Sequence, residues 1–328
     1  MNDTEHGNRT SRGQWTPNRL WRYPPLFVWP LRPVAALRWL VSWEGFLLPW
    51  LAIYLVISLA FWLWLTPSEP LSLDGALELL ARNLALVLFF YGTMHAWFYT
   101  ARGLGAQFKY NARFPSGGDP KFLFGHQARE NMFLTLCSAV PIWSAWELLF
   151  LWGYQAGWLS TLNLADNPLW FVALLLLIPL WQNLHFYLVH RAIHWPPLYR
   201  LVHQTHHKNV NPGPWSGLSM HSGKHLLYFS VPLLFLLVPS HPLHLVLAMV
   251  LTSFSPAKGH SGFEKLVVGG RLVDAGQWAH YLHHKRFKCN YADGFIPLGK
   301  WFGTFVDGSE QSLKDFHQRR RENKARDR

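Results

Sequence analysis

The sequence predicts an all-α integral membrane protein, with four transmembrane helices and a re-entrant or short helical hairpin below a histidine-rich cytoplasmic helical cap. Three observations indicate this class. Half of the 328 residues are hydrophobic and only 15% are charged, whereas soluble proteins are roughly 25% charged. Several apolar runs approach the roughly 20 residues that cross a bilayer. Fourteen of the 18 histidines fall between His185 and His284. The composition excludes a disordered or fibrous chain and disfavours a soluble enzyme.

Three regions follow from the distribution of charge and hydrophobicity. Residues 1–45 form a basic arm, rich in Trp, Pro and Arg, which is expected to lie at the membrane interface or to be partly disordered. Residues 46–310 are expected to form one membrane domain with a histidine-rich core at about 169–305. Residues 311–328 form a basic tail. The N-terminal segment lacks an apolar core, so no cleavable signal peptide is expected.

Four apolar runs are expected to span the membrane. They are 46–65, 84–100, 132–154 and 169–190. The third run contains Glu147, which is costly in lipid and is therefore expected to face protein. A fifth run, 226–254, is interrupted by Pro239 and Pro242. Because proline removes a backbone donor and disfavours helix in the preceding residue, this run is expected to form a hairpin of two short helices.

The connecting segments predict the orientation. Loop 101–131 holds five Lys or Arg residues and the tail from Ser312 holds seven, whereas 155–168 holds none. Because positively charged loops face the cytoplasm, both termini and the segments that carry the histidine clusters are expected to be cytoplasmic. The net charge of +12 is then explained by orientation. No nucleic-acid partner is expected, because the basic residues lie between apolar runs.

The histidines have a repeated spacing. One pair stands at i, i+4, and two triplets stand at i, i+3, i+4, which places each set on one face of a helix. The sets are His190 and His194; His203, His206 and His207; His280, His283 and His284. A solvated face would use Lys and Arg instead. Eight imidazoles exceed the needs of one tetrahedral zinc ion and suit two metals. Imidazole binds iron, zinc, copper and nickel, so the spacing alone does not name the metal.

These clusters and their flanks resemble a known family. The segment 183–194 resembles the first histidine box of the fatty acid hydroxylase / sterol desaturase superfamily, and 203–207 resembles the second. The segment 280–291 resembles the third box, and His260 resembles the single histidine that precedes it. The resemblance covers roughly residues 130–310. It implies a membrane-bound histidine-box di-iron oxygenase.

The resemblance also implies a set of site residues. Two iron ions would be held by His190, His194, His203, His206, His207, His260, His280, His283 and His284. Further candidates, for ligation or for hydrogen bonds that orient a ligand, are His185, His221, His225, Asn183, Asp274 and Asp293. The chain departs from the family pattern at Lys224, where many members carry an acidic residue. No catalytic residue beyond the metal ligands is expected, and a purified sample can carry another divalent metal.

The implied reaction is oxidation of a lipid C–H bond with O2. Hydroxylation is the default outcome, followed by sterol desaturation or sterol methyl oxidation. Sterol, fatty acyl, sphingoid and alkyl glycerol substrates all stay open. The sequence has no haem-domain, flavin or nicotinamide motif, so electrons are expected from a small haem carrier or a ferredoxin with its reductase. The alternative is a non-enzymatic membrane metal-binding or transport protein, which would place its ligands at mid-membrane on broken helices.

Overall fold

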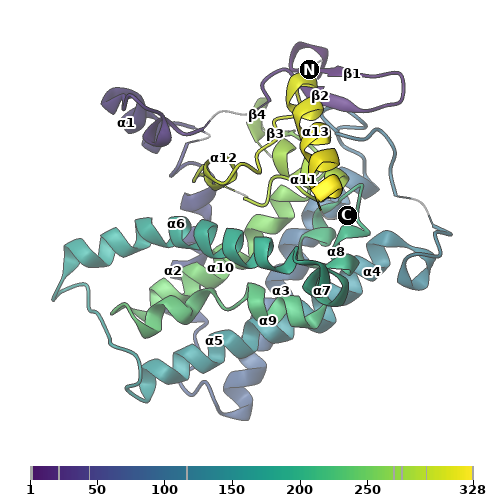
Figure 1. Cartoon of the computed structure of the whole chain (residues 1–328). Helices are drawn as coiled ribbons and strands as arrows, with labels where there is room; N and C mark the ends of the chain where they lie inside the picture. Colours follow the sequence, from purple (N-terminus) through teal and green to yellow (C-terminus); the bar gives the residue numbers. More distant parts are fainter. Residues whose placement is uncertain are drawn as a thin grey trace.

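The computed structural model describes residues 3–20, 23–43, 45–115, 117–268, 270–274, 276–292 and 294–326. The described chain is mostly helical, as the sequence predicts. Long helices occupy one side of the molecule, and β-strands and short helices gather on the other (Figure 1). We call this second part the cap.

Five helices form the long-helix part. They are α2 (Trp50–Trp64), α3 (Leu73–His95), α5 (Val140–Gln155), α6 (Pro168–Ile193) and α10 (Pro242–Gly259). A helix α4 (Gln127–Leu134) continues through the π-helical turn η5 (Thr135–Ala139) into α5. The Ser72 hydroxyl accepts the Gly75 N–H and so caps α3. Asn167 caps α6 in the same way, and Pro168 occupies its first position.

Two helical stretches of the described chain are both long and apolar enough to cross a membrane. They are Gln127–Gln155 and Pro168–Ile193, which contain the third and fourth predicted spans. The first predicted span contains α2, which is apolar but only 15 residues long. The second covers the second half of α3 and the π-helical turn η3 (Ala96–Thr100), and the first half of α3 carries charged residues such as Asp74 and Arg82. These charges lower the mean hydropathy of α3.

The predicted hairpin contains α9 (Ser222–Tyr228), the 3-10 helix η8 (Val231–Leu236) and α10. Helix α10 contacts α2, α3, α5 and α6. Nearly all of its side chains are buried, from Leu245 to Ala257. The returning helix of the hairpin is therefore the centre of the protein core, and its apolar character is explained by protein packing.

The outer surfaces of the long helices are apolar. Val56 on α2, Phe89 on α3 and Leu169 on α6 are between 68% and 85% exposed. Soluble monomers rarely expose apolar patches larger than a few hundred square ångströms. Exposed apolar side chains recur along three helices, which supports association with a membrane.

The cap contains two short β-hairpins, which the all-α prediction does not anticipate. Strands β1 (Gly7–Arg9) and β2 (Trp15–Pro17) pair antiparallel, and so do β3 (Lys265–Val268) and β4 (Arg271–Asp274). The second hairpin is explained by apolar residues on either side of a Gly-Gly pair, a sequence that favours a tight turn.

The first hairpin belongs to the N-terminal arm and packs on the cap. Trp15 is 1% exposed and lies edge-on to Phe108. The amide of Gln14 donates to the Tyr110 carbonyl at 3.1 Å. These contacts hold the start of the arm against segments more than ninety residues away.

The remaining helices mostly belong to the cap, and all of them except α13 are short. They are η1 (Asp3–Glu5), η2 (Pro25–Phe27), α1 (Pro33–Val41), η3 (Ala96–Thr100), η4 (Leu123–Gly125), α7 (Pro196–Leu198), η6 (Tyr199–His203), α8 (Gln204–His207), η7 (Pro214–Leu218), α11 (Trp278–Arg286), α12 (Leu298–Trp301) and α13 (Glu310–Arg326).

A buried ion pair joins α3 to α5. The guanidinium of Arg82 donates to a Glu147 carboxylate oxygen at 2.6 Å, and the two side chains are only 4% and 1% exposed. Asn83 donates to the Ser144 hydroxyl beside them at 3.1 Å. The prediction that Glu147 faces protein is confirmed.

Removing one partner of this pair should destabilise the protein strongly. Glu147→Gln leaves the Arg82 charge buried without its counter-ion, and we expect a loss of about 3–5 kcal/mol in the free energy of unfolding. Asp119→Asn, which breaks the exposed pair with Lys121, should leave the free energy of unfolding almost unchanged, because solvent screens an exposed ion pair. Unfolding of the detergent-solubilised variants measures both values. Equal losses would contradict the structural role of the buried pair.

Candidate metal centre

Nine buried or half-buried histidines converge in two groups. The first group is His190, His194, His203, His207 and His283, and the second is His206, His260, His280 and His284. Within each group the ring nitrogens that face inward lie within 4.8 Å of one another. These are the nine histidines that the sequence selects first.

The end of α6 places the first two histidines. Trp195 is followed by Pro196 and Pro197, and the residue before a proline avoids helical geometry, so α6 ends at Ile193. His190 and His194 therefore project from its last turn. The π-helical turn η6 then leads into α8 with its three histidines. Such wide turns are frequent at functional sites.

The other four histidines come from α10 and α11. His260 caps the C-terminus of α10, and α11 carries its three histidines on one and a half turns. After α11 the backbone adopts positive φ at Phe287 and Asn290. The Asn290 amide donates to the carbonyls of Ala279 and Val306 at 3.0 and 2.8 Å. These bonds fix the loop that follows the third histidine set.

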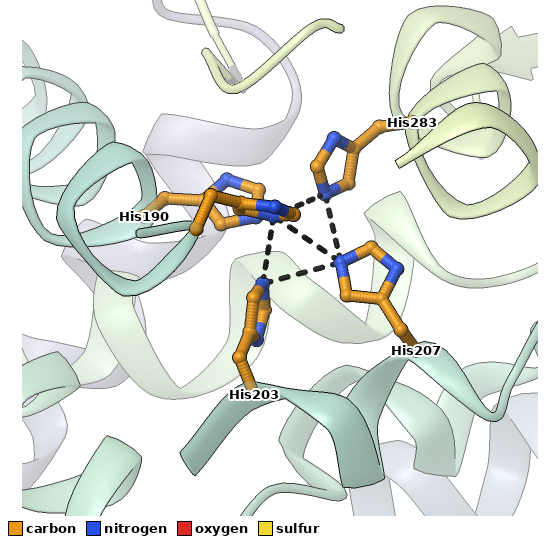
Figure 2. Close-up of side chains that lie close together, drawn as sticks. His190, His203, His207 and His283 are labelled. Carbon is orange, nitrogen blue, oxygen red and sulfur yellow. Dashed lines mark hydrogen bonds between the residues drawn. The ribbon is translucent and has the colours of Figure 1, made fainter. Parts of the chain in front are cut away.

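The inward nitrogens of the first group are unusually close. His194 Nε2 lies 3.0 Å from His203 Nε2 and 3.2 Å from His283 Nε2. His207 Nε2 lies 3.1 Å from His283 Nε2. Figure 2 shows His203, His207 and His283 directing ring nitrogens toward one another, with His190 beside them. A tetrahedral ion with nitrogens at about 2.0–2.1 Å holds them about 3.3 Å apart.

Hydrogen bonds on the opposite ring edges assign the tautomers. Nδ1–H of His206 donates to the Ser219 carbonyl at 3.2 Å, and Nδ1–H of His260 donates to the Pro256 carbonyl at 2.9 Å. A neutral imidazole carries one N–H, so each Nε2 presents a lone pair. These two Nε2 atoms are 3.3 Å apart. Two lone pairs at that distance repel each other unless a cation binds them both.

The first group shows the same arrangement. His283 Nδ1 donates to the Cys289 carbonyl at 2.6 Å, and His190 Nδ1 donates to the Tyr291 carbonyl at 2.9 Å. His190 Nε2 is buried and has no hydrogen-bond partner. Metal-bound histidines typically donate their second N–H to a carbonyl or carboxylate in this way. The residues present therefore fit metal ions in both groups.

Burial keeps the imidazoles in the neutral form that coordinates metals. It lowers the pKa of His260 and of His283 to about 3. For His203 and His206, burial is the first cause of the lowered pKa, and the nearby Lys224 ammonium is the second. Neutral imidazoles bind metal without first releasing a proton.

The two groups cut across the three sequence clusters. His203 and His207 belong to the first group, whereas His206 between them belongs to the second. Likewise His283 belongs to the first group, and its neighbours His280 and His284 belong to the second. Adjacent residues on a helix point about 100° apart, so one helix contributes to both groups.

The weaker histidine candidates lie outside both groups. Nε2 of His225 donates to the Leu218 carbonyl at 3.0 Å, and its Nδ1 accepts from the Ser138 hydroxyl at 2.8 Å. Both ring nitrogens of His225 are thus occupied by protein. His185 contacts the Ser230 hydroxyl at 2.9 Å. His221 is exposed and accepts the Gly223 N–H at the start of α9.

The non-histidine candidates also have other partners. The Asn183 side chain accepts from the Phe295 N–H at 2.7 Å and donates to the Pro179 carbonyl at 2.8 Å. It therefore joins the loop after α11 to α6. Asp274 forms an ion pair with Lys265. Asp293 lies outside the described residues.

A cavity of about 680 Å³ lies against the second group. His206, His260 and His280 contribute to its wall. Most of the remaining wall is apolar and comes from α2, α6, α10 and the N-terminal arm, through residues such as Trp39, Phe46, Leu51, Phe186 and Leu251. The volume lies within the range of about 300–1,000 Å³ that is typical of sites for small molecules. Sequence patterns missed the cavity because its wall joins residues that are distant in the chain.

Fold and site together describe a helical, membrane-associated protein with two histidine groups able to bind metal, beside a mostly apolar cavity. Residues 175–304 match the family model described as fatty acid hydroxylase. This part of the chain, less than half of its length, is similar to the fatty acid hydroxylase / sterol desaturase superfamily. This match includes all nine histidines of the two groups.

Similar curated proteins act on sterols, according to their names. The chain is 29% identical over 164 residues to a cholesterol 25-hydroxylase-like protein of Danio rerio, over 45% of this chain and 62% of that protein. It is 31% identical to a methylsterol monooxygenase of Aspergillus fumigatus, over 40% of this chain and 46% of the relative. It is 26% identical to a Delta(7)-sterol 5(6)-desaturase of the same fungus, over 41% of this chain and 49% of the relative. The chain thus spans about half of the length of these relatives or somewhat more. No solved structure matches the chain significantly.

The number of metal ions bound per chain should show whether each histidine group holds one ion. If each group holds one ion, protein loaded anaerobically with Fe(II) binds about two ions per chain, and either His203→Ala or His206→Ala lowers this value toward about one. His221→Ala, at an exposed histidine outside both groups, should retain the wild-type value. Elemental analysis of purified protein measures the ratio. A wild-type ratio of zero, or a loss only in His221→Ala, would contradict the assignment.

Proposed function

We propose that the protein is a membrane-bound di-iron oxygenase that oxidises a C–H bond of a lipid, using O2 and external electrons. The observation that carries this proposal is the contact between the four-histidine group and the apolar cavity, which share His206, His260 and His280. A lipid in the cavity would lie directly beside this group. The similarity of residues 175–304 to the fatty acid hydroxylase family model supports the same chemistry.

The two groups of histidine ligands support a pair of metal ions, and we choose iron because of the proposed reaction with O2. All nine candidate ligands are imidazoles, which suit several transition metals. Iron bound at both groups would supply the activation of O2 that an unreactive C–H bond requires. His206, His260, His280 and His284 would hold an ion at the wall of the cavity.

The chain's own residues provide position and exclude water. The carbonyls of Ser219 and Pro256 orient the imidazoles of the second group through their Nδ1–H atoms. Phe46, Leu51 and Phe186 present apolar surface that favours a hydrocarbon chain or ring system over water. Such a dry cavity limits side reactions of reactive species.

Hydroxylation is the outcome that we favour. Hydroxylation, desaturation and methyl oxidation start from the same hydrogen abstraction, and substrate placement decides between them. Sterol desaturation and sterol methyl oxidation are the next alternatives, and the names of two relatives support them. In a hydroxylation, one oxygen atom enters the lipid and the other leaves as water, so two electrons and two protons come from outside the lipid.

The proposed topology keeps the nine histidines on the cytoplasmic side. The distribution of Lys and Arg supports this orientation. Loop 101–131 holds five basic residues, which favours a cytoplasmic location for that loop and, with four spans, for both termini. The first five histidines of the site lie in the last turn of α6 or soon after it, where the chain leaves the apolar region. This location at the end of a span argues against a transporter, whose ligands would lie at mid-membrane.

A basic helix offers a docking surface for the electron donor. Helix α13 exposes Arg319, Arg320 and Arg321. Phe316 on the same helix packs with Cys289 and Val306, and the Cys289 carbonyl accepts from His283. An acidic carrier, either a small haem protein or a ferredoxin with its reductase, would therefore bind close to the first histidine group. The membrane lipids and the lipid substrate complete the expected partners.

Comparative lipid analysis should identify the reaction. Cells that express the protein should contain a lipid that has gained the mass of one oxygen atom or lost two hydrogen atoms. His283→Ala should abolish this product, because it removes a candidate ligand of the first group. His317→Ala, at an exposed histidine of α13, should leave the product unchanged. Identical lipid profiles with and without the gene would contradict the enzyme and favour a non-enzymatic metal-binding protein.

Turnover should depend on an added electron donor. The purified protein should oxidise lipid only with a reductase and a small acidic carrier present. Arg321→Glu should raise the KM for the carrier several-fold and weaken its salt dependence, because a charge at the edge of an interface mainly affects association. Lys121→Glu is the control, because it lies on a distant loop. Turnover without any reductant would refute the requirement for a donor.

A further inference from the structure

A lysine is buried beside the histidine centre without a counter-ion. Lys224 on α9 is 2% exposed. Within the part of the chain that the structure describes, its ammonium has no hydrogen-bond or ion-pair partner. Burial lowers the pKa of Lys224 well below its usual value. A buried cation without a partner is costly, so this position calls for a function.

The side chain of Lys224 lines the same cavity as the second histidine group. Its charge also influences histidines of both groups, including His206 and His283. The ammonium is thus near the candidate metal ligands and within reach of a molecule in the cavity. Among the described residues, no side chain pairs with the Lys224 ammonium, so the ammonium is available to bind such a molecule.

Most other charged groups in the cavity wall are already satisfied. Lys265 pairs with Asp274, and Tyr110 donates a hydrogen bond to Glu264. Lys258 lies over the Trp50 ring, 5.2 Å from its centroid. Lys224 differs from these groups because no side chain among the described residues compensates its charge.

The histidine centre itself increases the need for an anion. All nine candidate ligands are neutral imidazoles, so bound divalent ions would keep their full positive charge. The fully buried acids elsewhere pair with other cations, Glu130 with Lys208 and Glu147 with Arg82. Positive charges in a low-dielectric site repel strongly. A molecule that brings a negative charge into the cavity would be stabilised by both Lys224 and the metals.

We propose that Lys224 binds the carboxylate of an acyl lipid substrate and so holds the carbon atoms next to that carboxylate beside the histidine centre. This inference rests on the proposed function and names its substrate class. A single ammonium matches one carboxylate, whereas a phosphate is generally bound by several donors. The apolar wall formed by residues such as Phe46, Leu51 and Phe295 would hold the hydrocarbon chain.

The direct test is equilibrium binding to the full chain in lipid nanodiscs, with and without Fe(II). Radiolabelled C16 fatty acid is the probe, and its methyl ester, its primary alcohol and acetate are the competitors. The wild type should bind the acid at least tenfold more tightly than the ester or the alcohol. Acetate as an equal competitor would show a small-anion site only and would overturn the lipid assignment.

Substitution of the lysine should remove the preference for the acid. Lys224→Met should weaken acid binding at least tenfold and change ester binding by less than about threefold. Lys224→Gln, which keeps a donor and loses the charge, should behave similarly if Met is not tolerated. Lys258→Met is the matched control, because Lys258 also lines the cavity but is already partnered. A loss in Lys258→Met with no loss in either Lys224 variant would refute the proposal.

Thermal unfolding provides a second readout that does not depend on turnover. Without added lipid, Lys224→Met should unfold at a higher temperature than the wild type, because it replaces a buried amine that has no described hydrogen-bond or ion-pair partner, and such burial is costly in either protonation state. Added fatty acid should raise the unfolding temperature of the wild type and not that of the variant. Acid binding that depends on Lys224 without any lipid oxidation would disprove the proposed function alone. Equal binding of acid and ester by the wild type would disprove the inference alone.

Discussion

The arrangement of the site depends on one electrostatic constraint, which is the mutual repulsion of imidazole lone pairs when nine histidines are buried close together. Hydrogen bonds to backbone carbonyls occupy the Nδ1 atoms of four of them, including His206 and His260, and turn their Nε2 lone pairs inward. Without cations these lone pairs would face each other at about van der Waals distance or closer. The ends of α6 and α10, the π-helical turn η6, α8 and α11 meet here, and their histidines form two groups that could each hold a positive ion. The long helices supply the rigid frame that makes this arrangement possible.

Helical spacing was sufficient to select eight of the nine histidines, because helical periodicity is local, whereas His260 was selected only from the family resemblance. The spacing of His203, His206 and His207, or of His280, His283 and His284, places them near one face whatever the rest of the chain does. The burial of Glu147 was also predictable, since a carboxylate in an apolar run needs a protein partner. The identity of that partner, Arg82, depended on how α3 packs against α5, and spacing contains no such information.

The parts that sequence patterns missed all depend on contacts between distant segments. The division of the histidines into groups of five and four separates His206 from His207, and only the positions of the neighbouring helices decide it. The carbonyl acceptors are backbone atoms and leave no residue signature. The N-terminal hairpin was unpredicted because its stability comes from Trp15 against Phe108 and Tyr110. Lys224 looked like a departure from a family pattern, and only its burial in the cavity wall gives it a physical meaning.

X-ray absorption of the zinc-loaded protein tests the central claim most directly, because zinc reports ligand type without redox chemistry. If the two histidine groups are metal sites, the spectrum should show nitrogen neighbours at about 2.0–2.1 Å with the outer scattering of imidazole rings, and no sulfur at about 2.3 Å. His206→Ala should lower the bound zinc and leave imidazole as the main ligand of the remaining ion. A first shell dominated by sulfur or by water and carboxylate oxygen would contradict the account.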